Sequence, residues 1–162
     1  MQAVVVCDST FRNTARIAQA IASGLGERVP TRIVSASAAI EAPFEAPDVL
    51  LVGGPTQRHG LSPALLAFLD GLPSGSLRGV RAATFDTRYH MAALLSGSAA
   101  GQAAGRLRRT GCRLVASPES FFMDRDVPPK GQRRRHELEQ LENGELERAA
   151  GWGRRIAAEL QP

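Results

Sequence analysis

The densest group of side chains that could bind an anion lies in residues 8–14. The group consists of the hydroxyls of Ser9, Thr10 and Thr14, the amide of Asn13 and the guanidinium of Arg12. A helical pattern begins at its end, and the first turn of a helix offers free backbone N–H groups and the positive end of the helix dipole. We therefore predict a phosphate site here. The alternative is that these side chains only cap the helix, which serine, threonine and asparagine do routinely.

The elements that must position this site alternate between strand and helix patterns. Apolar runs typical of strands buried on both faces cover residues 3–6 and 48–52, and further strands are expected at residues 31–35, 80–85 and 112–116. Helical spacing begins at Asn13 and ends near Gly24 and Gly26, and it recurs over residues 61–71, 98–109 and 145–160. Residues 36–47 are expected to form a loop with at most one helical turn. This order predicts a doubly wound α/β domain with a five-stranded parallel sheet and helices on both faces.

In such sheets, ligands bind beyond the carboxyl ends of the strands, where the strand order reverses. The loops after the first, third and fourth strands therefore matter most. Gly53-Gly54-Pro55 is expected to end the third strand abruptly, and residues 86–97 are expected to form the loop after the fourth. Ser96 or Ser98 is available to cap the helix that follows.

The segments in these three loops resemble those of the flavodoxin family, and the resemblance extends through almost the whole chain. Residues 9–14 resemble the family's phosphate loop, residues 53–62 (GGPTQRHGLS) resemble its first isoalloxazine loop, and residues 85–88 (FDTR) stand where the second begins. Residues 118–121 and 144–149 are similar to sequences of bacterial flavodoxin-domain proteins. The resemblance implies a flavodoxin-like three-layer sandwich with strand order 2-1-3-4-5, which is the order known for flavodoxin itself, with FMN at its switch point.

The resemblance also implies the cofactor, flavin mononucleotide (FMN), and the residues that bind it. Those residues are Ser9, Thr10, Phe11, Arg12, Asn13, Thr14, Pro55, Thr56, Gln57, Arg58, His59, Gly60, Asp86, Thr87, Arg88 and Tyr89. His59, Tyr89 and His90 are candidates for an aromatic contact with the flavin ring. We expect no metal site, and the sequence identifies no catalytic residue.

The function implied is electron or hydride transfer through bound flavin, by an FMN-dependent oxidoreductase or by an electron carrier with a redox partner protein. Two departures from the family leave an alternative open. Arg12 stands where the family has glycine, and the chain is basic, with a net charge of +4, whereas flavodoxins that shuttle electrons are typically acidic. The alternative is a flavodoxin-fold binding or regulatory module that has lost its flavin.

Composition limits the remaining classes of protein. The 162 residues suit a single domain, residues 1–162, and the sequence lacks a signal peptide or an apolar run of membrane-spanning length, so we expect a cytoplasmic protein. Nucleic acid is not an expected partner, because aromatic residues make up only 5% of the chain and no nucleic-acid-binding motif is present. Residues 133–135 (RRR) are interpreted as a solvated face, with a docking patch for an acidic redox partner or weak attraction to nucleic acid as the alternative.

Three other chemistries that occur in α/β domains fail on spacing or residue type. Cys7 and Arg12 have four residues between them, one too few for the loop of a low-molecular-weight phosphatase. A response regulator needs aspartate at the end of the third strand, where this chain has Gly53-Gly54. A P-loop needs lysine followed by serine or threonine, and the only lysine, Lys130, lies outside any such loop. Cys7 and Cys112 are therefore interpreted as packing residues.

Overall fold

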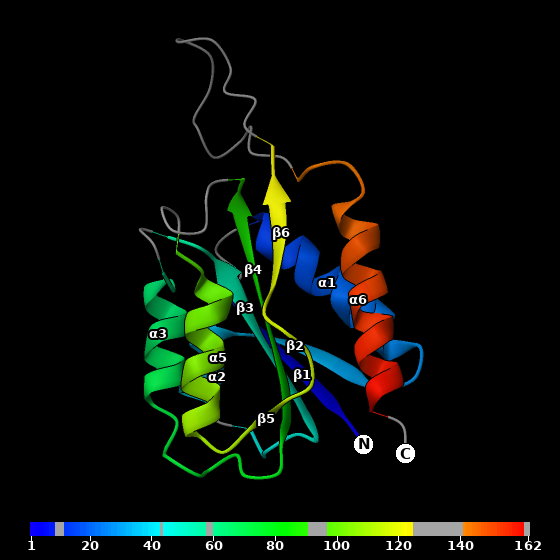
Figure 1. Cartoon of the computed structure of the whole chain (residues 1–162). Helices are drawn as coiled ribbons and strands as arrows, with labels where there is room; N and C mark the ends of the chain where they lie inside the picture. Colours follow the sequence, from blue (N-terminus) through cyan, green and yellow to red (C-terminus); the bar gives the residue numbers. More distant parts are fainter. Residues whose placement is uncertain (9–11, 43, 58–59, 91–96, 125–140, 161–162) are drawn as a thin grey trace.

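A parallel sheet forms the centre of the molecule (Figure 1). The computed structural model describes residues 1–8, 12–42, 44–57, 60–90, 97–124 and 141–160. The strands are β1 (Ala3–Cys7), β2 (Thr31–Ser35), β3 (Val49–Pro55), β4 (Arg81–Tyr89), β5 (Arg113–Leu114) and β6 (Glu119–Met123). Neighbouring strands are parallel in the order β2-β1-β3-β4-β5, and β6 also pairs with β4. The predicted doubly wound fold and strand order are confirmed.

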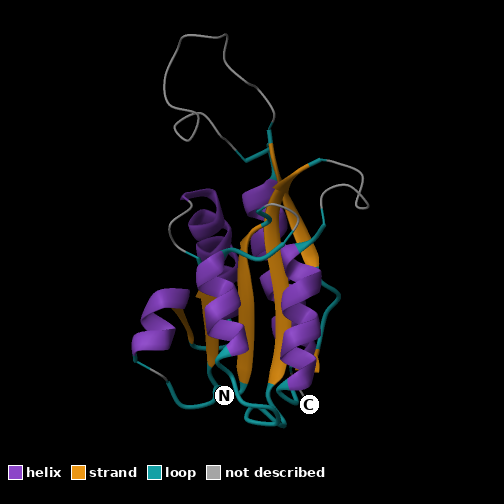
Figure 2. Ribbon diagram, turned by 90° about the vertical axis from the view of Figure 1, so that its left-hand side faces the viewer, coloured by secondary structure: helices purple, strands orange, loops and turns teal. Residues whose placement is uncertain are grey.

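Helices cover both faces of this sheet, and its central strands β1 and β3 are buried on both sides. The helices are α1 (Arg12–Gly26), α2 (Ala36–Glu41), α3 (Pro63–Asp70), α5 (Ala99–Arg109) and α6 (Glu145–Glu159). One hydrophobic cluster joins α1 and α6 to one face, and a second joins α2, α3 and α5 to the other. Figure 2 turns the second face to the viewer and shows its helices in front of the strands. None of the described helices combines the length and the apolar character that a bilayer span requires.

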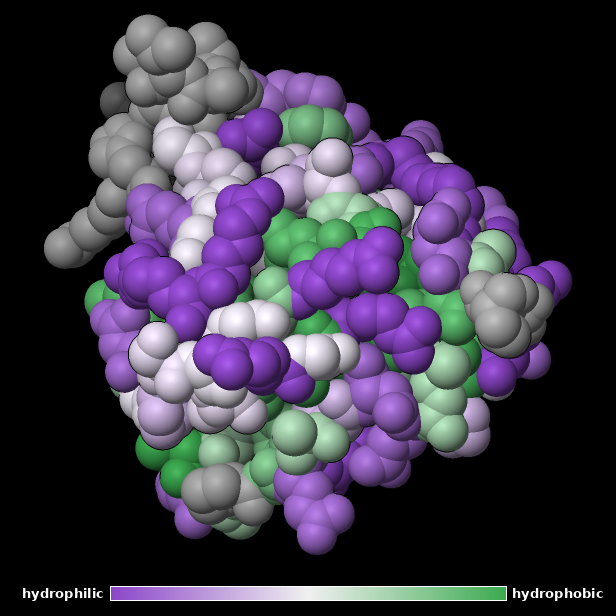
Figure 3. All heavy atoms as spheres, turned by 60° about the horizontal axis from the view of Figure 1, so that its bottom comes forward, coloured by the Kyte–Doolittle hydropathy of each residue, from purple (hydrophilic) through white to green (hydrophobic). Residues whose placement is uncertain are grey.

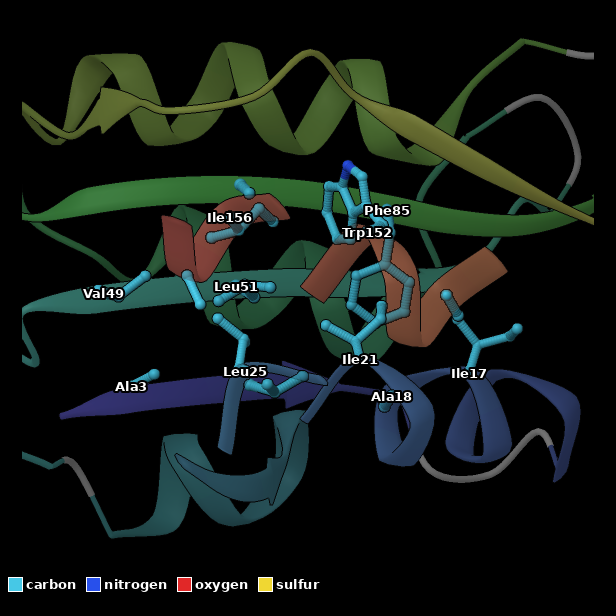
Figure 4. Close-up of a cluster of buried hydrophobic side chains, with 14 of the residues drawn as sticks. Ala3, Ile17, Ala18, Ile21, Leu25, Val49, Leu51, Phe85, Trp152 and Ile156 are labelled. Carbon is cyan, nitrogen blue, oxygen red and sulfur yellow. The ribbon is translucent and has the colours of Figure 1, made fainter. Parts of the chain in front are cut away.

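The cluster that joins α1 and α6 to the sheet combines aliphatic side chains with large aromatic ones, among them Phe85 and Trp152 (Figure 4). Trp152 of α6 lies edge-on to Phe85 of β4 and to Phe121 of β6, with ring centroids 6.4 and 6.2 Å apart. Edge-to-face pairs of buried rings contribute about 0.5–1.5 kcal/mol beyond the area that they bury. Trp152 therefore packs the last helix on the sheet.

Two glycines allow α1 and α6 to cross closely. A Cβ atom on Gly24 would lie 2.1 Å from the carbonyl oxygen of Ala150, and one on Gly153 would lie 2.4 Å from that of Ile21. Real Cβ atoms essentially never come so near to a backbone oxygen. The expectation that Gly24 helps to end the first helix was wrong: α1 continues to Gly26, and Gly24 is a helix-packing position.

Two strands extend further at their carboxyl ends than the sequence pattern indicated. β3 runs through Gly53 and Gly54 to Pro55, and β4 runs through Asp86 to Tyr89. The glycines therefore do not end the third strand, and the fourth loop begins later than expected. β3 pairs with one edge of β4. Along the other edge of β4, where one fifth strand was expected, β5 and β6 follow each other. The sequence pattern did not predict β6.

Candidate functional site

The alternation of side chains along β4 sends its polar residues to two different layers. Successive residues of a strand point to opposite faces of the sheet. Phe85 and Thr87 face α1 and α6, whereas Asp86 faces α5. Because β4 lies beside β3 in the sheet, this short stretch can contact both the start of α1 and the segments that follow β3 and β4.

The first turn of α1 carries the described part of the predicted phosphate loop. Arg12 is exposed, Asn13 and Thr14 are buried, and the turn contains no acidic residue. Arg12 is the first residue of the helix, where φ is negative, so arginine is accommodated there without a glycine-like backbone. A helix N-terminus with a guanidinium and no carboxylate is chemically suited to an anion.

Buried side-chain contacts fix this turn to the sheet. The Oγ1 atoms of Thr14 and Thr87 lie 2.7 Å apart, and the two residues are 0% and 1% exposed. The Nδ2 amide of Asn13 donates to the sulfur of Met123 on β6. The hydroxyl of Thr14 therefore anchors α1 to β4.

The end of β1 offers no reactive thiol beside this turn. Cys7 is buried, and burial together with the charge of the neighbouring Asp8 raises the pKa of its thiol to about 11. A thiol with so high a pKa is almost entirely protonated at neutral pH, so it is a poor nucleophile. This supports the interpretation of Cys7 as a packing residue.

The glycines that open the segment after β3 serve packing. A Cβ atom on Gly53 would lie 2.4 Å from the Phe85 ring, and one on Gly54 would lie 2.2 Å from Leu65. Beyond them, Gln57 and Gly60 exchange two backbone hydrogen bonds of 2.8 Å. Gly60 also lies close to Gln102 of α5. The described ends of this first loop are thus held together, and Gly60 lies against α5.

A fully buried carboxylate joins that loop to the start of α5. The Oδ2 atom of Asp86 accepts hydrogen bonds from the hydroxyls of Thr56 and Ser98, both at 3.0 Å, and from the amide of Ala100 at 3.1 Å. Thr56 in turn accepts a hydrogen bond of 3.0 Å from the amide of Ala99. A carboxylate at a helix N-terminus is also favoured by the helix dipole.

The second loop is held at both of its ends. The Nη1 group of Arg88 donates to the carbonyl of Gly97 at 2.8 Å, so residues on either side of the loop are brought together. The ring of His90 stacks on Phe122, with centroids 3.8 Å apart, and its Nε2 atom lies 3.1 Å from Glu142. One face of His90 is therefore already covered by an aromatic ring. Tyr89 is half-buried at the end of β4.

Beside this loop, an ion-pair cluster fixes β6 to the start of α6. Glu145 accepts hydrogen bonds from Arg148 at 2.7 and 2.8 Å and from the amide of Phe122 at 2.6 Å. Arg148 also contacts Glu119 and the carbonyl of Ser120. Burial opposes the charged carboxylate of Glu145, but the hydrogen bonds from Arg148 and Phe122 outweigh it and lower the pKa of Glu145.

The structure brings the described members of the predicted site together at the carboxyl ends of the strands. They are Arg12, Asn13, Thr14, Pro55, Thr56, Gln57, Gly60, Asp86, Thr87, Arg88 and Tyr89. Ser9, Thr10, Phe11, Arg58 and His59 lie outside the described residues, as do residues 133–135. Sequence reasoning foresaw Ser98 as a helix cap, which it is, but missed its bond to Asp86. It also missed Phe122 as the partner of His90, because the pattern of β6 was not recognised.

A shallow hollow of about 600 Å³ lies at the amino ends of the strands, at the other end of the sheet from the candidate site. It is lined by Met1, Arg81, Arg113, Leu114, Val115, Glu159 and Leu160. Figure 3 looks towards this end of the molecule, where hydrophilic side chains surround patches of hydrophobic ones. Ligands of doubly wound sheets bind at the carboxyl ends of the strands, so the hollow is not part of the candidate site. Within the described ranges, no group of three metal-binding side chains gathers.

Comparisons with known proteins identify the architecture. No protein-family model matches the sequence, and no curated protein matches it. Among solved structures, oxidised flavodoxin 1 from Bacillus cereus is 18% identical, with a TM-score of 0.76 over 99% of this chain and 100% of that one. A flavodoxin from the domain Archaea is 20% identical, with a TM-score of 0.67 over 98% of both chains. The chain therefore has the flavodoxin fold.

The same fold also occurs within longer chains. The flavodiiron protein from Giardia intestinalis is 17% identical and has a TM-score of 0.67, covering 98% of this chain but 36% of its own. The likeness is therefore to one part of that protein. At these identities the comparisons establish the fold, and the chemistry must be argued from the residues at the carboxyl edge.

Proposed function

We propose that this protein binds FMN at the carboxyl edge of β1, β3 and β4 and acts in electron or hydride transfer. The observation that carries the proposal is the meeting of three segments at this edge: the first turn of α1, the loop after β3 and the loop after β4. The edge is the switch point of the strand order, where doubly wound sheets bind ligands.

In this proposal, the start of α1 holds the phosphate of FMN. Arg12 supplies a guanidinium, and the first turn supplies backbone N–H groups with no competing carboxylate. The loops after β3 and β4 hold the ring system. When bound, the flavin supplies the chemistry of electron or hydride transfer, and the protein supplies binding and orientation. Whether the protein is an enzyme or an electron carrier depends on the partners that it meets.

The test is a titration of the purified protein with FMN and with riboflavin, which has the same ring but no phosphate. Binding is followed by flavin fluorescence and by absorbance near ~450 nm. We expect Arg12→Glu to weaken FMN binding by about ten- to a hundredfold, because it exchanges an attractive charge for a repulsive one. Riboflavin binding should be nearly unchanged. A carboxylate near a helix N-terminus favours the helix, so the variant should fold.

The matched control is Arg16→Glu, which makes the same exchange at an exposed position one turn further along α1. We expect only a small effect on FMN, since the dipole and the N–H groups act mainly at the first turn. Wild-type protein that binds neither flavin at millimolar concentration would refute the proposed function. It would favour the alternative of a flavin-free binding module.

A further inference from the structure

Asp86 stands out among the described residues of the candidate site as a fully buried carboxylate, with 0% exposure. A buried charge is costly unless it is paired or hydrogen-bonded. Three donors meet this need at Oδ2: the hydroxyls of Thr56 and Ser98 and the amide of Ala100. Oδ1 has no hydrogen-bond partner among the residues that the structure describes, and it lies 3.9 Å from Nε of Arg88.

The donors come from two different loops. Thr56 is the first residue after β3 and therefore opens the first loop, whereas Ser98 and Ala100 close the second loop and begin α5. Thr56 bonds in both directions, because it donates to Asp86 and accepts from the amide of Ala99. Its own amide donates to the carbonyl of Thr87 at 3.0 Å. The carboxylate thus lies at the centre of a network that fixes one loop relative to the other.

Charge matters to this network as well as shape. An ionised carboxylate only accepts hydrogen bonds, and charge-assisted bonds are roughly twice as strong as neutral ones. The start of α5, an eleven-residue helix, and the guanidinium of Arg88 both favour a negative charge here. Asparagine has nearly the same shape but offers a neutral oxygen and two N–H donors.

We propose that Asp86 is a positioning residue that sets the spacing of the two loops that hold the flavin ring. It acts through Thr56 and Ser98, and it does not touch the ring. This inference rests on the proposed function for its consequence, which is ring binding, but the network itself exists without any ligand. A change at Asp86 should therefore weaken binding of the flavin ring, whereas a change at Arg12 should weaken binding of the phosphate.

The experiment compares Asp86→Asn with Asp70→Asn, a control at a half-exposed carboxylate that pairs with Arg106. We expect Asp86→Asn to weaken binding of FMN and of riboflavin equally, by about tenfold or more, because the charge-assisted bonds that fix the two loops are lost. Asp70→Asn should change neither. A loss confined to FMN, or no loss, would overturn the positioning role.

A second pair of variants tests the network from the other loop and remains informative if Asp86→Asn does not fold. Thr56→Val removes the hydroxyl that bridges Asp86 and Ala99, whereas Thr56→Ser retains it. We expect weaker binding of both flavins by the valine variant and near wild-type binding by the serine variant. Near wild-type binding of both flavins by the valine variant would contradict the network, because it would show that the hydroxyl of Thr56 does not matter.

A ligand-free measurement separates this inference from the proposed function. Amide hydrogen exchange of the flavin-free protein should show that Asp86→Asn accelerates exchange at Ala99 and Ala100 by about tenfold or more. Unchanged exchange at both amides would refute the network, whether or not flavin binds. Accelerated exchange in a protein that binds no flavin would refute the proposed function and leave the network as a purely structural device.

Discussion

Replacing Gly24 by alanine tests the contact that holds α1, and with it the candidate anion site, against α6. The added Cβ atom would lie 2.1 Å from the carbonyl oxygen of Ala150 and 3.1 Å from the amide nitrogen of Arg154. Both atoms belong to the backbone of α6, so no side chain can rotate away. The two helices must move apart, which disturbs the packing of their buried side chains.

Two terms of opposite sign set the size of this effect. Alanine is favoured over glycine in a helix interior by about 1 kcal/mol. Overpacking a well-packed interface costs about 1 to 3 kcal/mol and sometimes more. Because the clash is with a rigid backbone, we expect the second term to dominate, with a net loss of about 2 kcal/mol in the free energy of unfolding.

The matched control is Gly105→Ala, in the middle of α5. A Cβ atom at Gly105 would meet nothing within 4 Å, so only the helix propensity remains. We expect this variant to be more stable than the wild type by about 0.5 to 1 kcal/mol. Opposite signs for the same chemical change would locate the effect in the contact between the helices.

Urea unfolding followed by tryptophan fluorescence measures both variants. Trp152 is the only tryptophan, and it is buried in α6 beside the contact. A Gly24→Ala variant as stable as the wild type, with the same dependence on urea, would show that α1 and α6 do not approach as closely as described here.

The remaining predictions concern titratable groups. Burial and the charge of Asp8 raise the pKa of the Cys7 thiol from 9.0 to about 11, which lowers its thiolate fraction at pH 8 about a hundredfold. A disulfide reagent should therefore label Cys7 at least a hundredfold more slowly in native protein than in urea. Rapid labelling of Cys7 in the native protein would contradict its burial. The pKa of Glu145 is lowered below its ordinary value of 4.5, so its contribution to stability is present above that pH and is lost as the pH falls through the folded-state pKa. Glu145→Gln should therefore lower the free energy of unfolding by on the order of 2 kcal/mol near neutral pH. The difference in this free energy between variant and wild type should shrink as the pH falls, which unfolding measured from pH 7 to pH 3 would show. A constant difference over this range would exclude the charge of Glu145 as its cause.

The sequence predicts the fold because its local signals agree with one another. Apolar runs of strand length alternate with helical periodicity, and this pattern leaves few arrangements other than a doubly wound sheet. Where a local signal conflicted with tertiary packing, the prediction failed. Gly53 and Gly54 look like strand-ending residues, but they lie within β3 because only glycine leaves room for Phe85 and Leu65.

β6 shows a second limit of pattern reading. Glu119–Met123 carries a mixture of polar and apolar residues, and it follows a proline, so its periodicity is weak. It forms a strand because β5 pairs only with Arg81 and Ala82 of β4, which leaves the same edge of β4 open for β6 from Phe85 to Tyr89. That pairing joins residues far apart in the chain, and a local pattern does not contain it.

The amino-acid sequence predicts the kind of donors at the site: hydroxyls, an amide and a guanidinium at the start of a helix, and polar residues after two buried strands. Tertiary structure alone decided how they are used. Thr14 faces Thr87, and Asp86 faces Thr56 and Ser98, because alternation along β4 directs neighbouring residues to opposite layers. Residue type limits the bonds that a side chain can make, but the partner depends on which strands and helices the fold brings together.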